Sequence, residues 1–222
     1  MQVEWYGQSA FALSAPEAAV FIDPFGDMAA AAARGLRFDY PPIAGVAADL
    51  LLVTHEHADH NNVDAIGGDP AILRSTAGRL QSPIGEVLAV ASEHDTAAGT
   101  ERGPNTIFVF ELGDLRVAHF GDFGQAGLRD EQAAAIGTVD LAFLPAGGGP
   151  TIDGARAAEI AGRIGARWVV PMHYRTPRVS FLEPVDGFLA HMSEAHHAGA
   201  TSFDTDALPQ AGAPVAVVLD AP

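Results

Sequence analysis

Residues 54–62 read T-H-E-H-A-D-H-N-N and come directly after the apolar run L-L-L-V at 50–53. A short, continuous apolar run of this kind predicts a strand that is buried on both faces. Residue types that bind metal ions recur within six positions of the nonapeptide: His55, His57, Asp59 and His60. The first two histidines leave the strand end two residues apart, so both imidazoles can converge on one cation. The aspartate and the third histidine can reach a second cation beside it.

Three further residues of metal-binding type also follow short apolar runs: His94 in A-S-E-H-D, Asp122 in H-F-G-D-F-G and His173 in V-V-P-M-H-Y. Side chains at strand ends share one rim of a sheet, so we expect all of these residues to meet there. The predicted ligands are His55, His57 and His94 on one metal ion, Asp59, His60 and His173 on the other, and Asp122 between the two. Three protein ligands per ion leave the open position that a catalytic site needs and a structural site lacks.

The composition excludes several classes of chemistry. The 222 residues include no cysteine, which rules out disulfides, thiolate zinc sites, iron–sulfur clusters and a cysteine nucleophile. All twelve basic residues are arginines, so no lysine is available for Schiff-base chemistry. With 28 acidic residues the formal net charge is −16, and the densest basic cluster is the pair Arg175 and Arg178. A nucleic-acid binder needs a basic stripe, so we expect no extended nucleic acid as a partner.

The apolar runs predict strands at 3–6, 10–13, 19–22, 50–53, 71–73, 86–90, 106–110, 115–119, 141–144, 168–170 and 215–219. Helical patterns are expected at 156–164 and 185–198, a weaker one at 129–136, and one helical turn at 28–34. Strands that later alternate with helices predict an α/β or α+β layered fold. No internal linker or repeat is visible, so we expect residues 1–222 to form one domain. No membrane span or secretion signal is recognisable, and we expect a cytoplasmic protein that contacts no membrane.

Ordered motifs along nearly the whole chain resemble those of the metallo-β-lactamase-fold hydrolases. They are W-Y-G-Q-S at 5–9, F-I-D-P at 21–24, H-E-H-A-D-H at 55–60, H-F-G-D at 119–122, L-A-F-L-P-A-G-G at 141–148 and V-V-P-M-H-Y at 169–174. The sequence looks most similar to the compact branch that includes ascorbate-6-phosphate lactonase. This resemblance implies a four-layer αββα sandwich with a two-metal site at the sheet edges. Members close to that branch often carry a histidine where this chain has Gln8, so the role of that residue stays open.

Two residues near the predicted ligands are candidates for supporting roles. Asp23 is expected to be a buried acceptor that orients a metal-bound imidazole, with a plain Asp-Pro turn as the alternative. His119 lies three residues before Asp122 and could support the ligands from behind, protonate the leaving group or replace a ligand. We rank the supporting role first, because His94 fits the family's third histidine better.

Candidate substrate contacts come from two loops. Gly148, within the glycine run 147–149, could let the backbone approach a substrate, and a flexible loop is the alternative. Arg175 and Arg178 follow His173 and could bind a carboxylate or phosphate by bidentate contacts, unless they are ordinary surface residues. Three histidines on the last helical pattern have no acids beside them and are expected at the surface: His191, His196 and His197.

These residues predict a metal-dependent hydrolase in which a hydroxide bridges two metal ions and attacks the substrate. Asp59 would orient the hydroxide and later carry a proton. Zinc is expected for this histidine-rich set, although manganese or iron would accept the same ligands. The substrate is expected to be an ester or lactone of a small, anionic molecule. The alternative substrate is a small phosphodiester. The alternative function, of another class, is that of a non-hydrolytic metal-binding sensor or interaction module on the same fold. A homo-oligomer is also compatible with the sequence.

Overall fold

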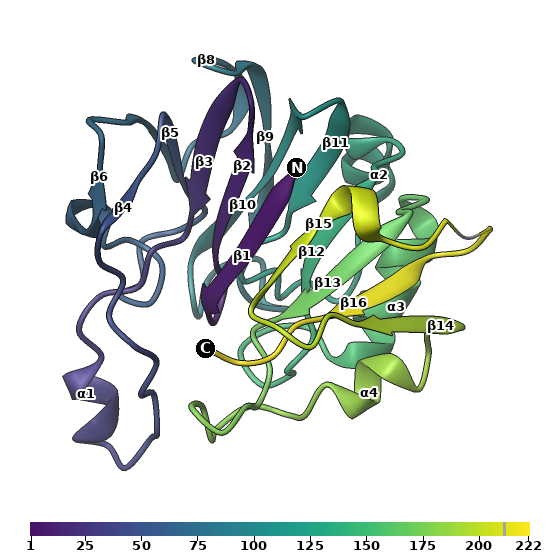
Figure 1. Cartoon of the computed structure of the whole chain (residues 1–222). Coiled ribbons are helices and arrows are strands. Elements are labelled where there is room, and N and C mark those ends of the chain that lie inside the picture. Colours follow the sequence, from purple (N-terminus) through teal and green to yellow (C-terminus); the bar gives the residue numbers. More distant parts are fainter. Residues whose placement is uncertain (211) are drawn as a thin grey trace.

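The computed structural model describes residues 1–210 and 212–222 and contains two large β-sheets packed face to face (Figure 1). In spatial order the first sheet consists of β15 (Ser202–Asp204), β1 (Gln2–Gly7), β2 (Ala10–Ala15), β3 (Ala18–Ile22), β5 (Leu50–Val53) and β7 (Ala71–Arg74). The second consists of β14 (Glu194–His197), β16 (Val215–Val218), β13 (Trp168–Met172), β12 (Leu141–Pro145), β11 (Leu115–His119), β10 (Pro104–Leu112), β9 (Gly85–Glu93) and β8 (Gly78–Ser82). The short strands β4 (Val46–Ala47) and β6 (Ile66–Gly67) pair with each other.

The core between the two sheets follows from the alternation of side chains along the strands. In β1, Val3 and Trp5 are buried while Glu4 between them is exposed, as in any strand with one buried face. Phe11 of β2 packs on Phe143 of β12, with ring centroids 4.6 Å apart. Side chains of both sheets therefore interdigitate in one apolar layer.

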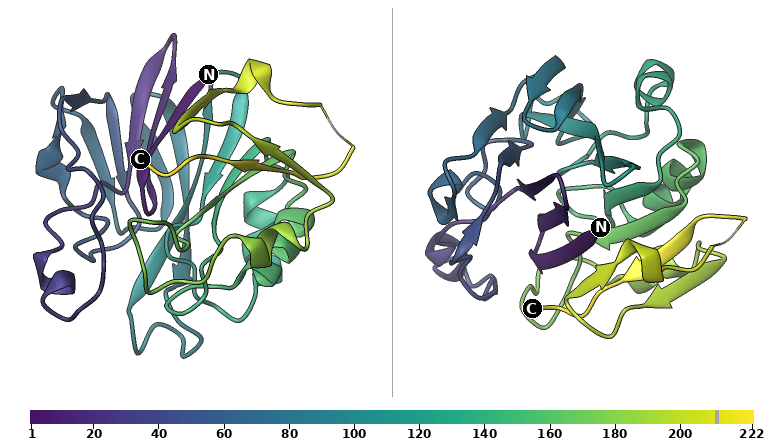
Figure 2. Two further views of the ribbon diagram at one scale, coloured as in Figure 1. Left: turned by 60° about the horizontal axis from the view of Figure 1, so that its bottom comes forward. Right: turned by 45° about the horizontal axis from the view of Figure 1, so that its top comes forward.

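Helices cover the outer face of the second sheet (Figure 2). They are α2 (Asp130–Ile136), α3 (Gly154–Arg163) and the shorter α4 (Asp186–Leu189). α3 begins after Asp153, whose side chain accepts a hydrogen bond of 2.8 Å from the backbone N–H of Arg156. Its apolar face, with Ala157 and Ile160, packs on the sheet.

The outer face of the first sheet is covered mainly by loops. Leu51 and Val53 of β5 point away from the central layer and pack with Phe25 and Tyr40, which belong to the segment between β3 and β4. This segment carries only the single-turn helix α1 (Ala29–Ala32), and 3-10 turns lie at Val63–Ala65 and Thr205–Ala207. The mixed α/β class and the layered sandwich are confirmed, with one outer layer built largely from irregular chain.

Four strands lead the chain to one rim of the sandwich. β9 and β11 are both antiparallel to β10, and β11, β12 and β13 are parallel, so β9, β11 and β13 run in the same direction. β5 of the first sheet ends beside them, where the N–H of Thr106 donates to the carbonyl of Thr54 over 3.0 Å. The predicted strand ends therefore meet at one edge of the sandwich.

Most predicted elements are confirmed, and the helix expected at 185–198 is wrong. α4 occupies only its beginning, and Glu194–His197 form β14 instead. β14 pairs in parallel with β16 at the end of the second sheet, with His196 opposite Val217. The local apolar spacing favours a helix, but the open edge of β16 supplies backbone hydrogen bonds that outweigh this preference.

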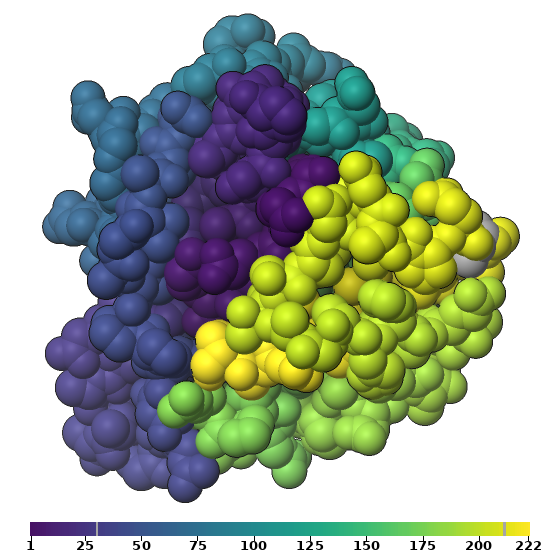
Figure 3. Space-filling view, in the orientation of Figure 1, coloured from purple at the N-terminus to yellow at the C-terminus, as the bar shows by residue number. Residues whose placement is uncertain are grey.

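The C-terminal part of the chain packs against the N-terminal strands. Figure 3 shows the C-terminal segments, in yellow, against the N-terminal strands, in purple. This contact is the antiparallel pairing of β15 with β1, in which Val3 lies opposite Phe203. Within the described ranges, none of the helices combines the length and the apolar character that a membrane crossing requires.

Candidate metal centre

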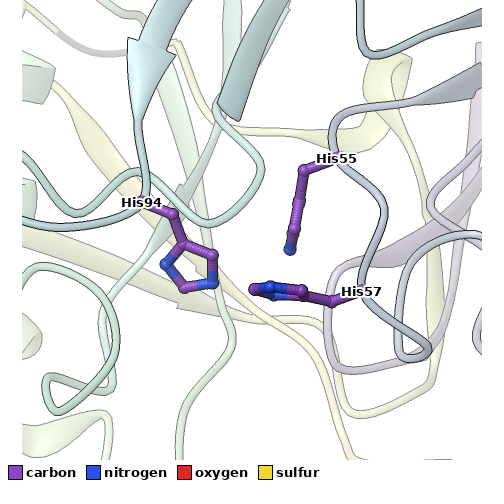
Figure 4. Close-up of side chains that lie close together, drawn as sticks. All are labelled: His55, His57 and His94. Atoms are coloured by element: carbon purple, nitrogen blue, oxygen red, sulfur yellow. The ribbon is translucent and has the colours of Figure 1, made fainter. Parts of the chain in front are cut away.

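The structure brings the predicted ligands together in two clusters at the rim. Within each cluster the candidate ligand atoms lie within 4.8 Å of one another. The first cluster consists of His55, His57 and His94 (Figure 4). The second consists of Asp59, His60, Asp122 and His173. Each cluster combines residues that follow β5 with residues that follow strands of the second sheet.

Asp122 lies between the two clusters. Its Oδ2 atom is 3.1 Å from Nε2 of His94 and 3.2 Å from Nε2 of His173, so one carboxylate oxygen faces a histidine of each cluster. The backbone N–H of Asp122 donates to Oδ1 of Asn105 over 3.0 Å. The preceding Gly121 has a φ of +55°, and a Cβ there would lie 2.4 Å from the same Asn105 oxygen, so this tight turn requires glycine.

Three of the imidazoles are held by their Nδ1 atoms. His60 Nδ1 lies 2.9 Å from Oδ2 of Asp23, and His94 Nδ1 lies 3.0 Å from the carbonyl oxygen of Pro150. His55 Nδ1 lies 3.1 Å from the hydroxyl of Thr54, which itself donates to Asp23 over 2.7 Å. These acceptors place the ring proton on Nδ1 and leave Nε2 with its lone pair toward the cluster, the arrangement usual for metal-binding histidines.

Burial and neighbouring charges set the protonation of the clusters. Burial, together with the other imidazoles, lowers the pKa of His55 to about 2, so this ring is neutral and able to donate its lone pair. Burial also acts to lower the pKa of His60, but the carboxylates of Asp122, Asp59 and Asp23 outweigh it and raise that pKa well above its usual range. The carboxylates thus favour a positive charge at the second cluster, carried either by a second proton on Nε2 of His60 or by a metal ion that takes the place of that proton.

The donor set fits divalent metal ions. Nε2 of His55 and Nε2 of His60 are buried without a hydrogen-bond partner among the described residues. A buried polar atom without a partner costs free energy, unless a ligand satisfies it. Neutral imidazoles and ionised carboxylates are the ligands that zinc and related cations take when no thiolate is present.

Comparison with known proteins identifies the family. A model of the beta-lactamase superfamily domain matches residues 2–173. The chain belongs to the metallo-β-lactamase superfamily.

Relatives of this superfamily cover most of the chain. A UPF0173 protein of Pyrococcus abyssi is 28% identical over 199 residues, which cover 79% of this chain and 84% of that protein. A UPF0173 metal-dependent hydrolase of Nitratidesulfovibrio vulgaris is 30% identical over 200 residues, which cover 79% of this chain and 80% of that protein. One similar crystal structure is that of a Thermotoga maritima protein described as a proposed Zn-dependent hydrolase of the superfamily. The two chains superpose with a TM-score of 0.78 at 26% identity, over 100% of this chain and 99% of the Thermotoga chain. The protein is accordingly a metal-dependent hydrolase of the metallo-β-lactamase superfamily.

A cavity of about 510 Å³ opens onto both clusters of this superfamily member. Ligand candidates of both clusters line its base, among them His57, Asp59 and His94. Two cations that no motif of the sequence marks also line this cavity, Arg34 and Arg102. Neither lies beside a metal-binding motif in the sequence, so only the folded chain reveals their position.

The three predicted substrate contacts lie outside this cavity. The Nε–H of Arg175 donates to the carbonyl of Leu182 over 2.7 Å, and that of Arg178 donates to the carbonyl of Pro222 over 3.0 Å. Gly148 has a φ of +59°, and a Cβ there would lie 2.8 Å from the carboxylate of Glu183. Arg175 and Arg178 follow His173 in the sequence, but the contacts of their Nε atoms are with backbone carbonyl groups of Leu182 and Pro222. A role of these three residues in substrate binding therefore stays a prediction.

His119 lies behind the clusters, fully buried between aromatic rings. Its Nε2 donates to the carbonyl of Ser9 over 3.1 Å, and its Nδ1 accepts from the N–H of Gly121 over 3.2 Å. With both ring nitrogens bonded to backbone, it has no proton to give a leaving group in the cavity. This placement favours the supporting role over that of a leaving-group acid or an alternative ligand.

Gln8 and Asp23 both reach the second cluster from the first sheet. The side-chain N–H of Gln8 donates to Oδ2 of Asp59 over 3.3 Å, and both Gln8 and Asp23 have a φ of +52°. Left-handed backbone in such residues is costly and is found mainly where function requires it. By contrast, the three C-terminal histidines lie on or beside β14 and α4, away from the clusters: His191, His196 and His197.

Proposed function

We infer that this protein hydrolyses an ester or a lactone of a small molecule, with two divalent metal ions bound at the two clusters. The observation that supports this proposal most is the position of Asp122, whose Oδ2 lies within 3.2 Å of His94 and of His173. A carboxylate placed in this way can bridge two cations, as two-metal hydrolases require. The adjoining cavity of about 510 Å³ suits a small substrate.

Each candidate ligand has an assigned role in this proposal. The proposed ligands are His55, His57 and His94 for one ion, Asp59, His60 and His173 for the other, and Asp122 for both. When bound, two divalent cations would supply a hydroxide nucleophile near neutral pH by lowering the pKa of a shared water. Zinc is the metal we propose first, in line with the Zn-dependent description of the related Thermotoga maritima structure. Manganese and iron(II) would accept the same ligands.

Asp59 is the residue we propose for proton transfer. It lines the cavity, and the N–H of Gln8 fixes the orientation of its carboxylate. Burial acts to raise the pKa of Asp59, but the neighbouring His60 outweighs it and lowers that pKa, so the carboxylate is ionised at neutral pH. An ionised carboxylate at the edge of the cavity can orient the nucleophile, accept its proton and pass that proton to the leaving oxygen.

A reconstitution assay tests the proposal. Protein freed of metal with a chelator is loaded with zinc, manganese or iron(II) and assayed with 4-nitrophenyl acetate, with γ- and δ-lactones and with bis(4-nitrophenyl) phosphate. We expect metal-dependent turnover of an ester or lactone, reduced about 100-fold or more in Asp122→Asn. The matched control is His197→Gln, an exposed histidine on β14.

The other outcomes separate the alternatives. Turnover of the phosphodiester alone would replace esterase or lactonase activity with phosphodiesterase activity. If no metal restores turnover of any of these substrates, the ester and lactone proposal is wrong, and a metal-binding sensor or interaction module on the same fold becomes the better description.

A further inference from the structure

The arginines of this chain fall into two groups. Ten of the twelve place their guanidinium group on a carboxylate or on a backbone carbonyl oxygen. Within residues 1–210 and 212–222, the other two guanidinium groups contact no acceptor, and these belong to Arg34 and Arg102. Both line the cavity over the metal centre. The same cavity is lined by Asp59 and Asp122 at the clusters, so the two guanidinium groups are its cations that lie outside the clusters and are free to meet an anion.

The backbone of Arg102 is held in place by a buried carboxylate. Oδ2 of Asp95 accepts the N–H of Arg102 over 2.7 Å and that of Glu101 over 3.1 Å. Its Oδ1 accepts the N–H groups of Ala97 and Gly99, both over 2.8 Å. Four amides on one side chain fix the loop between β9 and β10, so the arginine is presented at the cavity on an ordered backbone. Less freedom is then lost when it binds a ligand.

Arg34 reaches the cavity from a different part of the fold. It follows α1 in the segment between β3 and β4, whereas Arg102 belongs to the second sheet's β9–β10 loop. Apolar side chains line the same cavity: Met28, Leu36 and the exposed Phe181. The lining of the cavity therefore combines candidate metal ligands, two unpaired cations and apolar side chains.

We propose that Arg34 and Arg102 are specificity-determining residues that bind an anionic group of the substrate, a carboxylate or a phosphate, placed on a short apolar chain away from the scissile bond. This inference rests on the proposed hydrolase function and gives Arg34 and Arg102 the anion-binding role for which Arg175 and Arg178 were the candidates in the sequence. Guanidinium groups bind both anions through charge-assisted hydrogen bonds, which are stronger than neutral ones.

Three esters of one leaving group and one chain length test this proposal. They are 4-nitrophenyl valerate, mono(4-nitrophenyl) glutarate and 4-nitrophenyl 4-phosphonobutyrate, in which the terminal methyl group is replaced by a carboxylate or a phosphonate. We expect the metal-loaded wild type to prefer one or both anionic esters by about tenfold or more in kcat/KM. If the carboxylate ester is preferred over the valerate ester more strongly than the phosphonate ester is, the arginines bind a carboxylate. The reverse order indicates a phosphate.

The variants are Arg34→Gln, Arg102→Gln and the double variant, with Arg37→Gln as the matched control. Arg37 lies in the same segment as Arg34, but its guanidinium donates to the carbonyl of Pro177 over 3.2 Å. Each single change is expected to reduce the preference for the anionic ester about threefold or more, through KM, and the double variant to abolish it. The control is expected to keep the wild-type preference. A double variant that discriminates as well as the wild type would overturn the proposal.

A binding measurement separates this proposal from the hydrolase function. If no ester is hydrolysed, glutarate is titrated into the metal-loaded wild type and double variant by calorimetry. Both proteins keep the metal centre, so weaker binding to the double variant alone supports the arginine site. Equal affinity for both would reject it.

Discussion

Nδ1 of His60 and Oδ2 of Asp23 lie 2.9 Å apart, and both side chains are fully buried. The same carboxylate accepts the hydroxyl proton of Thr54, which holds His55 in turn. Asp23 therefore orients one imidazole of each cluster, one directly and one through a hydroxyl group. A side chain that orients a histidine in each cluster makes the geometry of one cluster depend on that of the other.

Replacing Asp23 with asparagine is expected to weaken metal binding without removing a ligand. The amide keeps the size of the side chain but loses the charge that favours the Nδ1 proton of His60, so the metal affinity of the second cluster should fall about 10- to 100-fold. Chelator competition followed by a metal indicator measures this affinity. Asp64→Asn, at an exposed position, is the control. Unchanged affinity in Asp23→Asn would show that this contact has no effect on the metal.

The two clusters predict a metal stoichiometry. Elemental analysis of the untagged wild type, purified without chelator, should give two equivalents per chain. His94→Ala and His173→Ala each remove a candidate ligand from a different cluster, so each should retain about one equivalent. One equivalent in the wild type, unchanged on adding metal, would contradict the assignment of the second cluster.

His119 predicts a pH dependence of stability. Burial lowers its pKa to about 4, from about 6.5 in the unfolded chain. Between pH 6.5 and pH 4 the unfolded chain therefore binds a proton at His119 that the native protein does not bind. The contribution of His119 to the free energy of unfolding is complete above pH 6.5 and is lost as the pH falls toward 4. Between pH 7.5 and pH 5 this loss amounts to about 2 kcal/mol.

The comparison variant is His119→Gln, whose amide can still donate to Ser9 and accept from Gly121. Urea unfolding of both proteins at the two pH values, under identical metal conditions, should show the wild type losing about 2 kcal/mol more than the variant. An equal loss in both proteins would mean that His119 is protonated in the native state.

Two glycines give opposite predictions for the same substitution. A Cβ at Gly124 would lie 2.4 Å from the backbone carbon of His94, so Gly124→Ala should destabilise the protein by about 1–3 kcal/mol and displace that ligand. Gly162, near the end of α3, has open space around it. There the substitution should stabilise by about 0.5–1 kcal/mol, since alanine favours the helix. Thermal unfolding of both variants checks the pair, and a stable Gly124→Ala would contradict this packing.

The sequence predicted those features that depend on neighbouring residues in the chain. The apolar runs before His55, His94 and His173 are strong local signals, and each forms the expected strand. Since such strands end at a common rim, the meeting of the ligand candidates followed from topology alone. The edge strand β8, at Gly78–Ser82, had no such signal because its only apolar side chain is Leu80.

The missed features depend on contacts between distant segments. β14 exists because β16 lies beside it, and no pattern within Glu194–His197 indicates a strand. Arg34 and Arg102 are separated by 68 positions in the chain and become neighbours of one cavity only after folding. Arg175 and Arg178 were selected because they follow His173 in the sequence, and their part in substrate binding stays a prediction.

Each cluster draws its residues from both sheets, with the 55–60 loop on one side and residues after β9, β11 and β13 on the other. A cation bound at either cluster is therefore a cross-link between the two halves of the sandwich. Because it binds only when both halves are in register, free metal raises the melting temperature by mass action. Removal of the metal should therefore loosen the sandwich first at this rim, so the same ion that the chemistry needs would also hold the two sheets together.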